Sequence, residues 1–148
     1  MPQAKRSLED WKVPVKVKLA LLWASLMSLY IYNDYFSLYQ PGTIANMSAG
    51  RMGPLGPATA VVMIAVSLLL AIPALMIFLS AALPPGPCKW LNVLLALAYS
   101  AIEALTITRP VPSYRIAVAL EIAVTLLIVW HALRWPSVAP AQPDRFSA

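Results

Sequence analysis

Four long apolar segments alternate with short polar or proline-rich segments along the chain. The apolar segments cover residues 15–39, 58–83, 90–108 and 114–135. At ~1.5 Å per residue, each is about long enough as a helix to cross the ~30 Å hydrocarbon core of a bilayer. Short turns between successive spans favour up-and-down packing. The pattern therefore predicts an all-α fold, in which residues 1–135 form one integral membrane domain, an antiparallel four-helix bundle.

The segments between and after the spans predict where the chain turns. Residues 40–57 form a loop, which we expect to fold back over the helix ends as a cap, with a helical turn in its first half. Residues 84–87 and 109–112 are proline-rich and predict abrupt turns. Pro73 predicts a kink in the second span, because its ring clashes with the carbonyl four residues earlier. Residues 136–148, rich in Pro, Ala, Ser and Gln, predict a disordered tail.

The composition is that of a membrane protein. Of the 148 residues, 60% are hydrophobic and 11% charged, with a mean hydropathy of +0.71, whereas soluble domains average roughly 25% charged residues. The net charge of +5 comes from basic residues scattered beside the spans. This distribution predicts a lipid bilayer, and not nucleic acid, as the partner. Cys88 is the single cysteine, which excludes an internal disulfide and a cysteine-based metal site within one chain. We predict neither a cofactor nor a metal site.

Basic residues are distributed unequally between the two sides of the predicted membrane domain. On the side of the N-terminus lie eight of them: Lys5, Arg6, Lys12, Lys16, Lys18, Lys89, Arg134 and Arg145. On the other side lie Arg51, Arg109 and Arg115. The positive-inside rule therefore predicts a multi-pass protein with both termini in the cytoplasm. The first apolar segment is too long for a signal peptide and precedes no small-x-small cleavage pattern, so we expect an uncleaved span.

Three acidic residues interrupt three different spans at one depth. Counted at ~1.5 Å per residue from the basic residues at the cytoplasmic ends of their spans, Asp34, Glu103 and Glu121 lie about 24, 21 and 20 Å into the membrane. An ionised carboxylate at mid-bilayer costs roughly 2.5–3.5 kcal/mol on insertion scales. Such groups therefore pair with a charge, take up a proton or line water.

The residues near this depth allow two main interpretations and a minor one. In the first, the acids line an outward-facing pocket. Its further candidates are Tyr30, Tyr32, Tyr35, Tyr99, Thr106 and Thr125. In the second, Glu103 and Glu121 form a structural clamp with counter-charges, and Asp34 accepts hydrogen bonds from tyrosines at the rim. The candidate counter-charges are Arg51, Arg109 and Arg115. The minor alternative is placement in the interfacial aromatic belt, which accounts for Tyr35 and Tyr39 but less well for Tyr30.

Established catalytic motifs are absent from the sequence. It contains no Gly-rich phosphate loop, H-E-x-x-H or C-x-x-C motif. Ser25 and Ser28 have no histidine at their depth, which argues against a Ser-His-Asp hydrolase. His131 lies about ten residues, or ~15 Å, from the acids, so we interpret it as facing the headgroups. No catalytic residue is assigned.

Several short segments resemble those of a known family. They are Asp10–Val13, Val15–Leu19, Leu22–Met27, Leu29–Tyr32, Asp34–Phe36, Arg51–Pro57, Ala71–Ser80 and Thr125–Trp130. Together, over residues 9–135, they resemble an uncharacterised family of small bacterial four-span integral membrane proteins that is known as a domain of unknown function. The resemblance implies a protein of the bacterial inner (plasma) membrane. It implies no activity.

Three functions are compatible with these observations. The first is an outward-facing acidic pocket that binds or transports a small molecule or cation, in a protein for which a homodimer is plausible. The second is a non-catalytic accessory or assembly subunit that docks a larger membrane complex through its tyrosine-bearing faces. The third is a membrane enzyme that acts on a lipophilic substrate by carboxylate acid–base chemistry.

Overall fold

The computed structural model describes residues 11–107 and 111–137, and within these residues the chain forms helices and no strand. The elements are α1 (Val15–Ser37), α2 (Thr43–Ser48), the 3₁₀ turn η1 (Gly53–Leu55), α3 (Ala60–Ala82), α4 (Pro85–Thr106) and α5 (Pro112–Leu133). Residues 1–10 and Arg109 lie outside the described residues, as does the predicted tail from residue 138.

Four of these helices have the length and apolarity needed to cross a membrane. α1, α3, α4 and α5 contain 22 or 23 residues each, and each is apolar over most of its length. At ~1.5 Å per residue, each is about 33 Å long. The predicted all-helical fold with four membrane-spanning helices is therefore confirmed at the level of length and composition.

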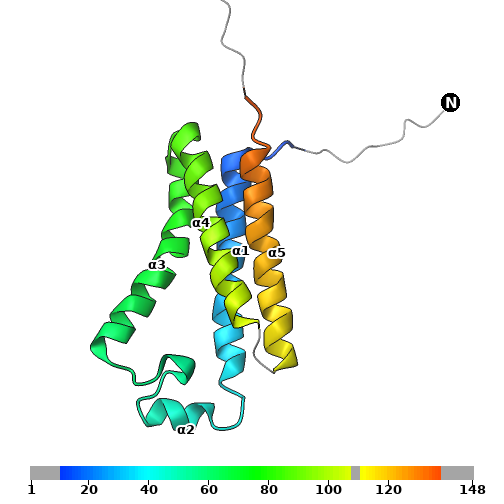
Figure 1. Cartoon of the computed structure of the whole chain (residues 1–148). Coiled ribbons are helices and arrows are strands. Elements are labelled where there is room, and N and C mark those ends of the chain that lie inside the picture. Colours follow the sequence, from blue (N-terminus) through cyan, green and yellow to red (C-terminus); the bar gives the residue numbers. More distant parts are fainter. Residues whose placement is uncertain (1–10, 108–110, 138–148) are drawn as a thin grey trace, which may run out of the picture.

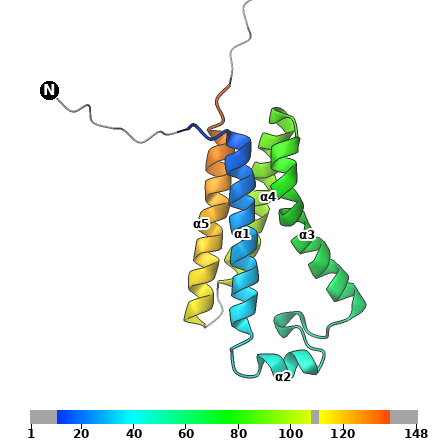
Figure 2. The same cartoon turned by 180° about the vertical axis from the view of Figure 1, so that it is seen from behind.

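The long helices lie side by side and their ends gather at two levels (Figures 1 and 2). The beginnings of α1 and α4 and the ends of α3 and α5 lie at one level, which we call the terminal end. A hydrogen bond from Lys16 Nζ to the carbonyl of Ala81, 3.4 Å long, links α1 to α3 there. The short helix α2 lies across the opposite level, which we call the loop end.

The buried core occupies the half of the molecule next to the terminal end. α1 contributes Leu19, Trp23 and Leu26, each fully buried. The other helices contribute Met76 from α3, Val93 and Ala96 from α4, and Ile128 and Ala132 from α5. Most of these residues come from the first half of α1 and α4 or the second half of α3 and α5, so the helices pack most tightly at this end.

Helix α3 leaves the other helices toward the loop end. Its second half contains the buried residues Pro73, Met76 and Ser80, whereas no residue from 60 to 72 is buried. Figures 1 and 2 show the first half of α3 slanting away from α1 and α4. The predicted compact bundle therefore describes the terminal half better than the loop half.

Two local predictions need correction. The loop after α1 contains the predicted helical turn as α2, but it does not cap the bundle. Its apolar residues Ile44, Met47 and Leu55 are all more than half exposed, because the slant of α3 removes a helix end on which they could rest. The turn predicted at residues 84–87 is also shorter than expected. α4 begins at Pro85, since the first turn of a helix does not need the N–H groups that prolines lack.

Candidate functional site

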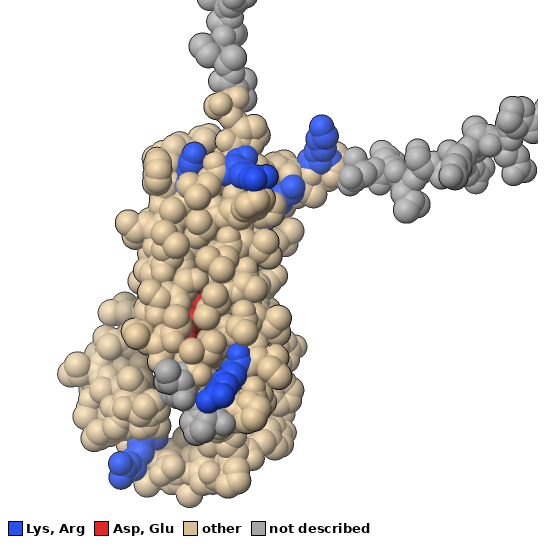
Figure 3. Space-filling view, turned by 45° about the vertical axis from the view of Figure 1, so that its right-hand side comes forward, with Lys and Arg blue, Asp and Glu red and all other residues tan. Residues whose placement is uncertain are grey.

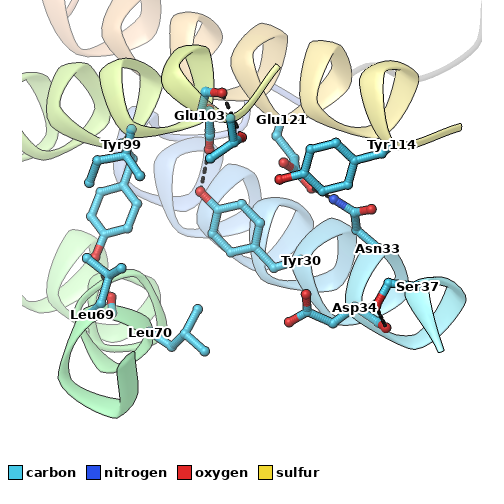
Figure 4. A pocket seen from close by; sticks show the side chains of 12 residues that line it. Tyr30, Asn33, Asp34, Ser37, Leu69, Leu70, Tyr99, Glu103, Tyr114 and Glu121 are labelled. Carbon is cyan, nitrogen blue, oxygen red and sulfur yellow. Dashed lines mark hydrogen bonds between the residues drawn. The ribbon is translucent and has the colours of Figure 1, made fainter. Parts of the chain in front are cut away.

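A pocket of about 250 Å³ opens in the half of the molecule that the core leaves unfilled. All four long helices contribute to it. It is lined by Tyr30, Asn33, Asp34 and Ser37 of α1, Leu69 and Leu70 of α3, Tyr99, Ile102, Glu103 and Thr106 of α4, and Tyr114 and Glu121 of α5. Figure 4 shows most of these side chains directed into the space between the helices.

Helical spacing explains why α1 presents four polar side chains to this pocket. Tyr30, Asn33, Asp34 and Ser37 follow one another at intervals of three, one and three residues, which places them on one face of a helix. The same face begins at the terminal end with the buried Trp23. The inward face of α1 thus changes from apolar to polar where α3 moves away.

Two of the carboxylates are deeply buried and receive hydrogen bonds from neutral donors. Glu103 and Glu121 are 5% and 3% exposed. The Tyr30 hydroxyl donates to one oxygen of Glu103 (Figure 4), and Thr125 Oγ1 donates to the other across 3.5 Å. Asn33 Nδ2 donates to Glu121 Oε1 across 3.2 Å. Both carboxylates line the same pocket.

Asp34 occupies a different position from the glutamates. It belongs to the exposed residues of α1 while also lining the pocket, and Figure 4 shows its carboxylate directed past Tyr30 toward the side on which Leu70 lies. Asp34 therefore lies at the mouth of the pocket, whereas Glu103 and Glu121 lie inside it.

Basic side chains lie toward both ends of the molecule in the view of Figure 3. Figure 3 shows lysine and arginine gathered at the terminal end and further basic side chains toward the loop end. Between these two levels the visible surface is uncharged apart from a small acidic area at mid-height. No described lysine or arginine lines the pocket.

The structure brings six of the predicted site residues together and leaves others elsewhere. The pocket contains Asp34, Glu103, Glu121, Tyr30, Tyr99 and Thr106. Thr125 is buried behind it and also shares a 2.6 Å hydrogen bond with Ser100. Tyr32 and Tyr35 do not line it, because they project from a different face of α1 and are 62% and 50% exposed.

The predicted counter-charges do not enter the pocket in the described part of the chain. Arg51 lies in the exposed loop and Arg115 is exposed on α5, while Arg109 is not described. The donors to Glu103 and Glu121 are instead the uncharged side chains of α1 and α5. The clamp interpretation, which pairs both glutamates with arginines, stays a prediction.

Sequence reasoning missed several lining residues. Asn33 carries a signal that could have revealed it, since an amide within a membrane span needs a partner and lies one residue from Asp34. Tyr114 lies at the very start of the fourth span, where an interfacial aromatic residue is ordinary. Leu69 and Leu70 carry no signal, because leucines facing lipid and leucines facing a pocket are identical in sequence.

Among the described residues, no group of three His, Cys, Asp or Glu side chains is arranged to hold a metal ion. The three carboxylates line one pocket from three different helices.

A protein-family model matches most of the chain. It is described as a family of unknown function, DUF6326, and it matches residues 7–141. No curated protein and no solved structure matches the chain.

Proposed function

This chain belongs to DUF6326, a family without an assigned function, and from its geometry we propose that it binds a small organic cation in the pocket and carries it across the membrane. In this proposal the protein lies in the inner membrane of a bacterium as an antiparallel bundle. Both termini face the cytoplasm, as the eight-to-three distribution of basic residues indicates. The pocket then opens in the outer half of the bilayer.

The observation that carries the proposal is the convergence of three carboxylates from three helices on one pocket. Asp34, Glu103 and Glu121 line it together, and the described hydrogen-bond donors to Glu103 and Glu121 are uncharged side chains. Hydrogen bonds from Tyr30 and Asn33 stabilise the buried carboxylates without neutralising them. Inside a membrane such groups need a compensating positive charge or a proton. A bound cation supplies that charge.

The size and walls of the pocket favour an alkylammonium ion. Its volume of about 250 Å³ is below the ~300–1,000 Å³ that is usual for drug-sized ligands. Tyr30, Tyr99 and Tyr114 supply three aromatic rings, whose faces attract cations. Alkylammonium ions are weakly hydrated, so they lose little hydration free energy on leaving water. They therefore fit this environment better than a metal ion.

Transport follows if a proton replaces the cation when it leaves. The Glu103–Glu121 pair keeps one proton throughout and takes up a second as the singly charged cation departs, so that no uncompensated charge stays buried. The tightly packed core at the terminal end separates the pocket from the cytoplasm. The cycle therefore requires repacking of the helices around residues such as Trp23, which is fully buried there.

Binding and flux of radiolabelled tetraethylammonium test this proposal. The purified protein should bind it saturably, and proteoliposomes with a proton gradient should accumulate it. Glu103→Gln combined with Glu121→Gln should weaken binding at least tenfold, or by about 1.4 kcal/mol, because both substitutions keep the volume and remove the charge. Tyr39→Phe, outside this pocket, is the control. Undiminished binding by the folded double variant, or no saturable binding by the folded wild type, would contradict the proposal.

A docking role is the second candidate, and a groove that adjoins the pocket favours it. A groove of about 480 Å³ lies between α1 and α5 and is lined by Tyr32, Phe36 and Tyr39 together with Tyr114. The first three are more than 60% exposed, and aromatic residues are enriched at protein interfaces. An accessory subunit should copurify in mild detergent with a partner at fixed stoichiometry, and Phe36→Ala should release that partner. Elution of the folded protein alone would contradict this role.

A further inference from the structure

The walls of the pocket differ in chemistry. α1, α4 and α5 contribute carboxylates, hydroxyls and an amide, whereas α3 contributes only Leu69 and Leu70. The pocket is therefore amphipathic, with its charges on three helices and an apolar wall on the fourth.

The apolar wall continues into the membrane-facing surface of the molecule. No residue from 60 to 72 in α3 is buried, and Leu68 and Leu69 are 63% and 39% exposed. The one hydroxyl of this half, on Ser67, donates to the carbonyl of Met63 in its own helix, 2.8 Å away. This half of α3 thus presents hydrocarbon both to the pocket and to the bilayer.

The opposite side of the opening is equally accessible. On α1, Ile31 is 62% exposed and Asp34 belongs to the exposed residues. Figures 1 and 2 show the loop-end halves of α1 and α3 diverging, while their other halves remain together. Asp34 of α1 and Leu69 of α3 both line the pocket and are both exposed at the molecular surface.

From these features we propose that the ligand is an amphiphilic ammonium ion with one cationic head and one alkyl chain, and that it enters the pocket from the bilayer. Its cationic head lies beside Glu103 and Glu121, and its alkyl chain passes Leu69 and Leu70 and leaves between α1 and α3 into the lipid. A phospholipid is excluded as the ligand, because its phosphate would lie beside these carboxylates. The inference rests on the proposed function and adds to it the class of substrate and its route.

The length of the ligand's alkyl chain gives a sharp test. A pocket of about 250 Å³ is too small to hold a long chain, so a long-chain ligand can bind only if its chain extends out of the pocket. Butyl-, octyl- and dodecyltrimethylammonium compete with radiolabelled tetraethylammonium for the full chain in nanodiscs. If the tail lies in lipid, the aqueous concentration for half-displacement should fall about fourfold per methylene up to dodecyl. A rise or a plateau beyond octyl would overturn the inference while leaving the proposed function intact. Absence of tetraethylammonium binding would overturn both.

A matched pair of substitutions on α3 separates a specific route from nonspecific partitioning. Leu70→Trp fills the apolar wall and should weaken dodecyltrimethylammonium binding at least tenfold, and more than it weakens tetraethylammonium binding. Leu68→Trp adds the same side chain at a position of α3 that does not line the pocket, and should change neither affinity. Equal effects of the two substitutions on the long-chain compound would contradict the route.

Discussion

Asn92 joins three helices through one side chain. Its Oδ1 accepts hydrogen bonds from Trp23 Nε1 of α1 at 2.7 Å and from Ser80 Oγ of α3 at 3.1 Å. Its Nδ2 donates to the carbonyl of Cys88 at 2.8 Å in its own helix. All four residues are fully buried. Because the surroundings offer no water, each of these polar groups depends on the others for its hydrogen bonds.

Replacing Asn92 by leucine should therefore be strongly destabilising. Asn92→Leu keeps a similar volume but leaves Trp23 and Ser80 without their acceptor, which should lower the free energy of unfolding by about 3 kcal/mol. Asn46→Leu, on the exposed helix α2, is the control and should change it by no more than about 0.5 kcal/mol. Reversible unfolding in mixed micelles measures both, and equal stabilities would contradict the role of Asn92.

A second residue-scale prediction concerns two tyrosines that lie two positions apart on α1. Tyr30 donates to Glu103, whereas Tyr32 is 62% exposed. Tyr30→Phe should lower the free energy of unfolding by about 1.5 kcal/mol, because a buried carboxylate loses a donor. Tyr32→Phe should lower it by less than about 0.5 kcal/mol. The same unfolding measurement compares them, and a larger effect at Tyr32 would show that the hydrogen bond to Glu103 contributes little.

At the scale of the element, α3 owes its shape to one proline and to a hydroxyl from another helix. Pro73 has no N–H, so the carbonyl of Leu69, four residues earlier, lacks its helical donor. The hydroxyl of Tyr99 on α4 donates to that carbonyl. Membrane helices tolerate proline where a neighbour satisfies the freed carbonyl in this way. The bond ties α3 to α4 at the level where α3 turns away.

A double-mutant cycle should expose this dependence. Tyr99→Phe alone should lower the free energy of unfolding by about 1 kcal/mol, because the carbonyl of Leu69 loses its donor. In the Pro73→Ala background, a backbone N–H becomes available to that carbonyl, so the effect of Tyr99→Phe should fall below about 0.5 kcal/mol. The free energies of unfolding of the wild type, the two single variants and the double variant give the coupling free energy between Pro73 and Tyr99. Identical effects in both backgrounds would show that the tyrosine does not compensate for the proline.

At the scale of the whole molecule, the four long helices pack together at the terminal end, and α3 diverges from the other three toward the loop end. The buried residues of α1 all lie in its first half, and those of α3 in its second. Lysines and arginines concentrate at the terminal end (Figure 3). If the proposed orientation holds, the protein is sealed toward the cytoplasm and open toward the outer leaflet.

Cysteine labelling tests this orientation. Cys88 is fully buried, so the wild type should react little with a membrane-impermeant maleimide. Ser48→Cys, on the exposed α2, should be labelled in intact cells, whereas Lys12→Cys, exposed before α1, should be labelled only after permeabilisation. The positions are matched in exposure and lie at opposite ends of α1. The reverse labelling pattern would place both termini outside.

The sequence by itself determined the four spans and the shared depth of the acids. A chain segment that crosses a bilayer must satisfy its own backbone groups, which a long apolar helix does internally, so apolar runs of this length reveal the spans. A helix also rises by a constant distance per residue, so the depths of Asp34, Glu103 and Glu121 can be counted. Both conclusions depend on local geometry alone.

Only the tertiary structure decided which side chains share the pocket. The rotation of a helix about its axis is set by packing against its neighbours. Because apolar side chains can face either lipid or protein, the sequence of a span does not show which side faces the other helices. For this reason Tyr30 and Tyr32 are equivalent in sequence, yet one contacts Glu103 and the other is exposed. The divergence of α3 is equally hidden, because the helix is apolar on all sides and its pattern contains no preferred face.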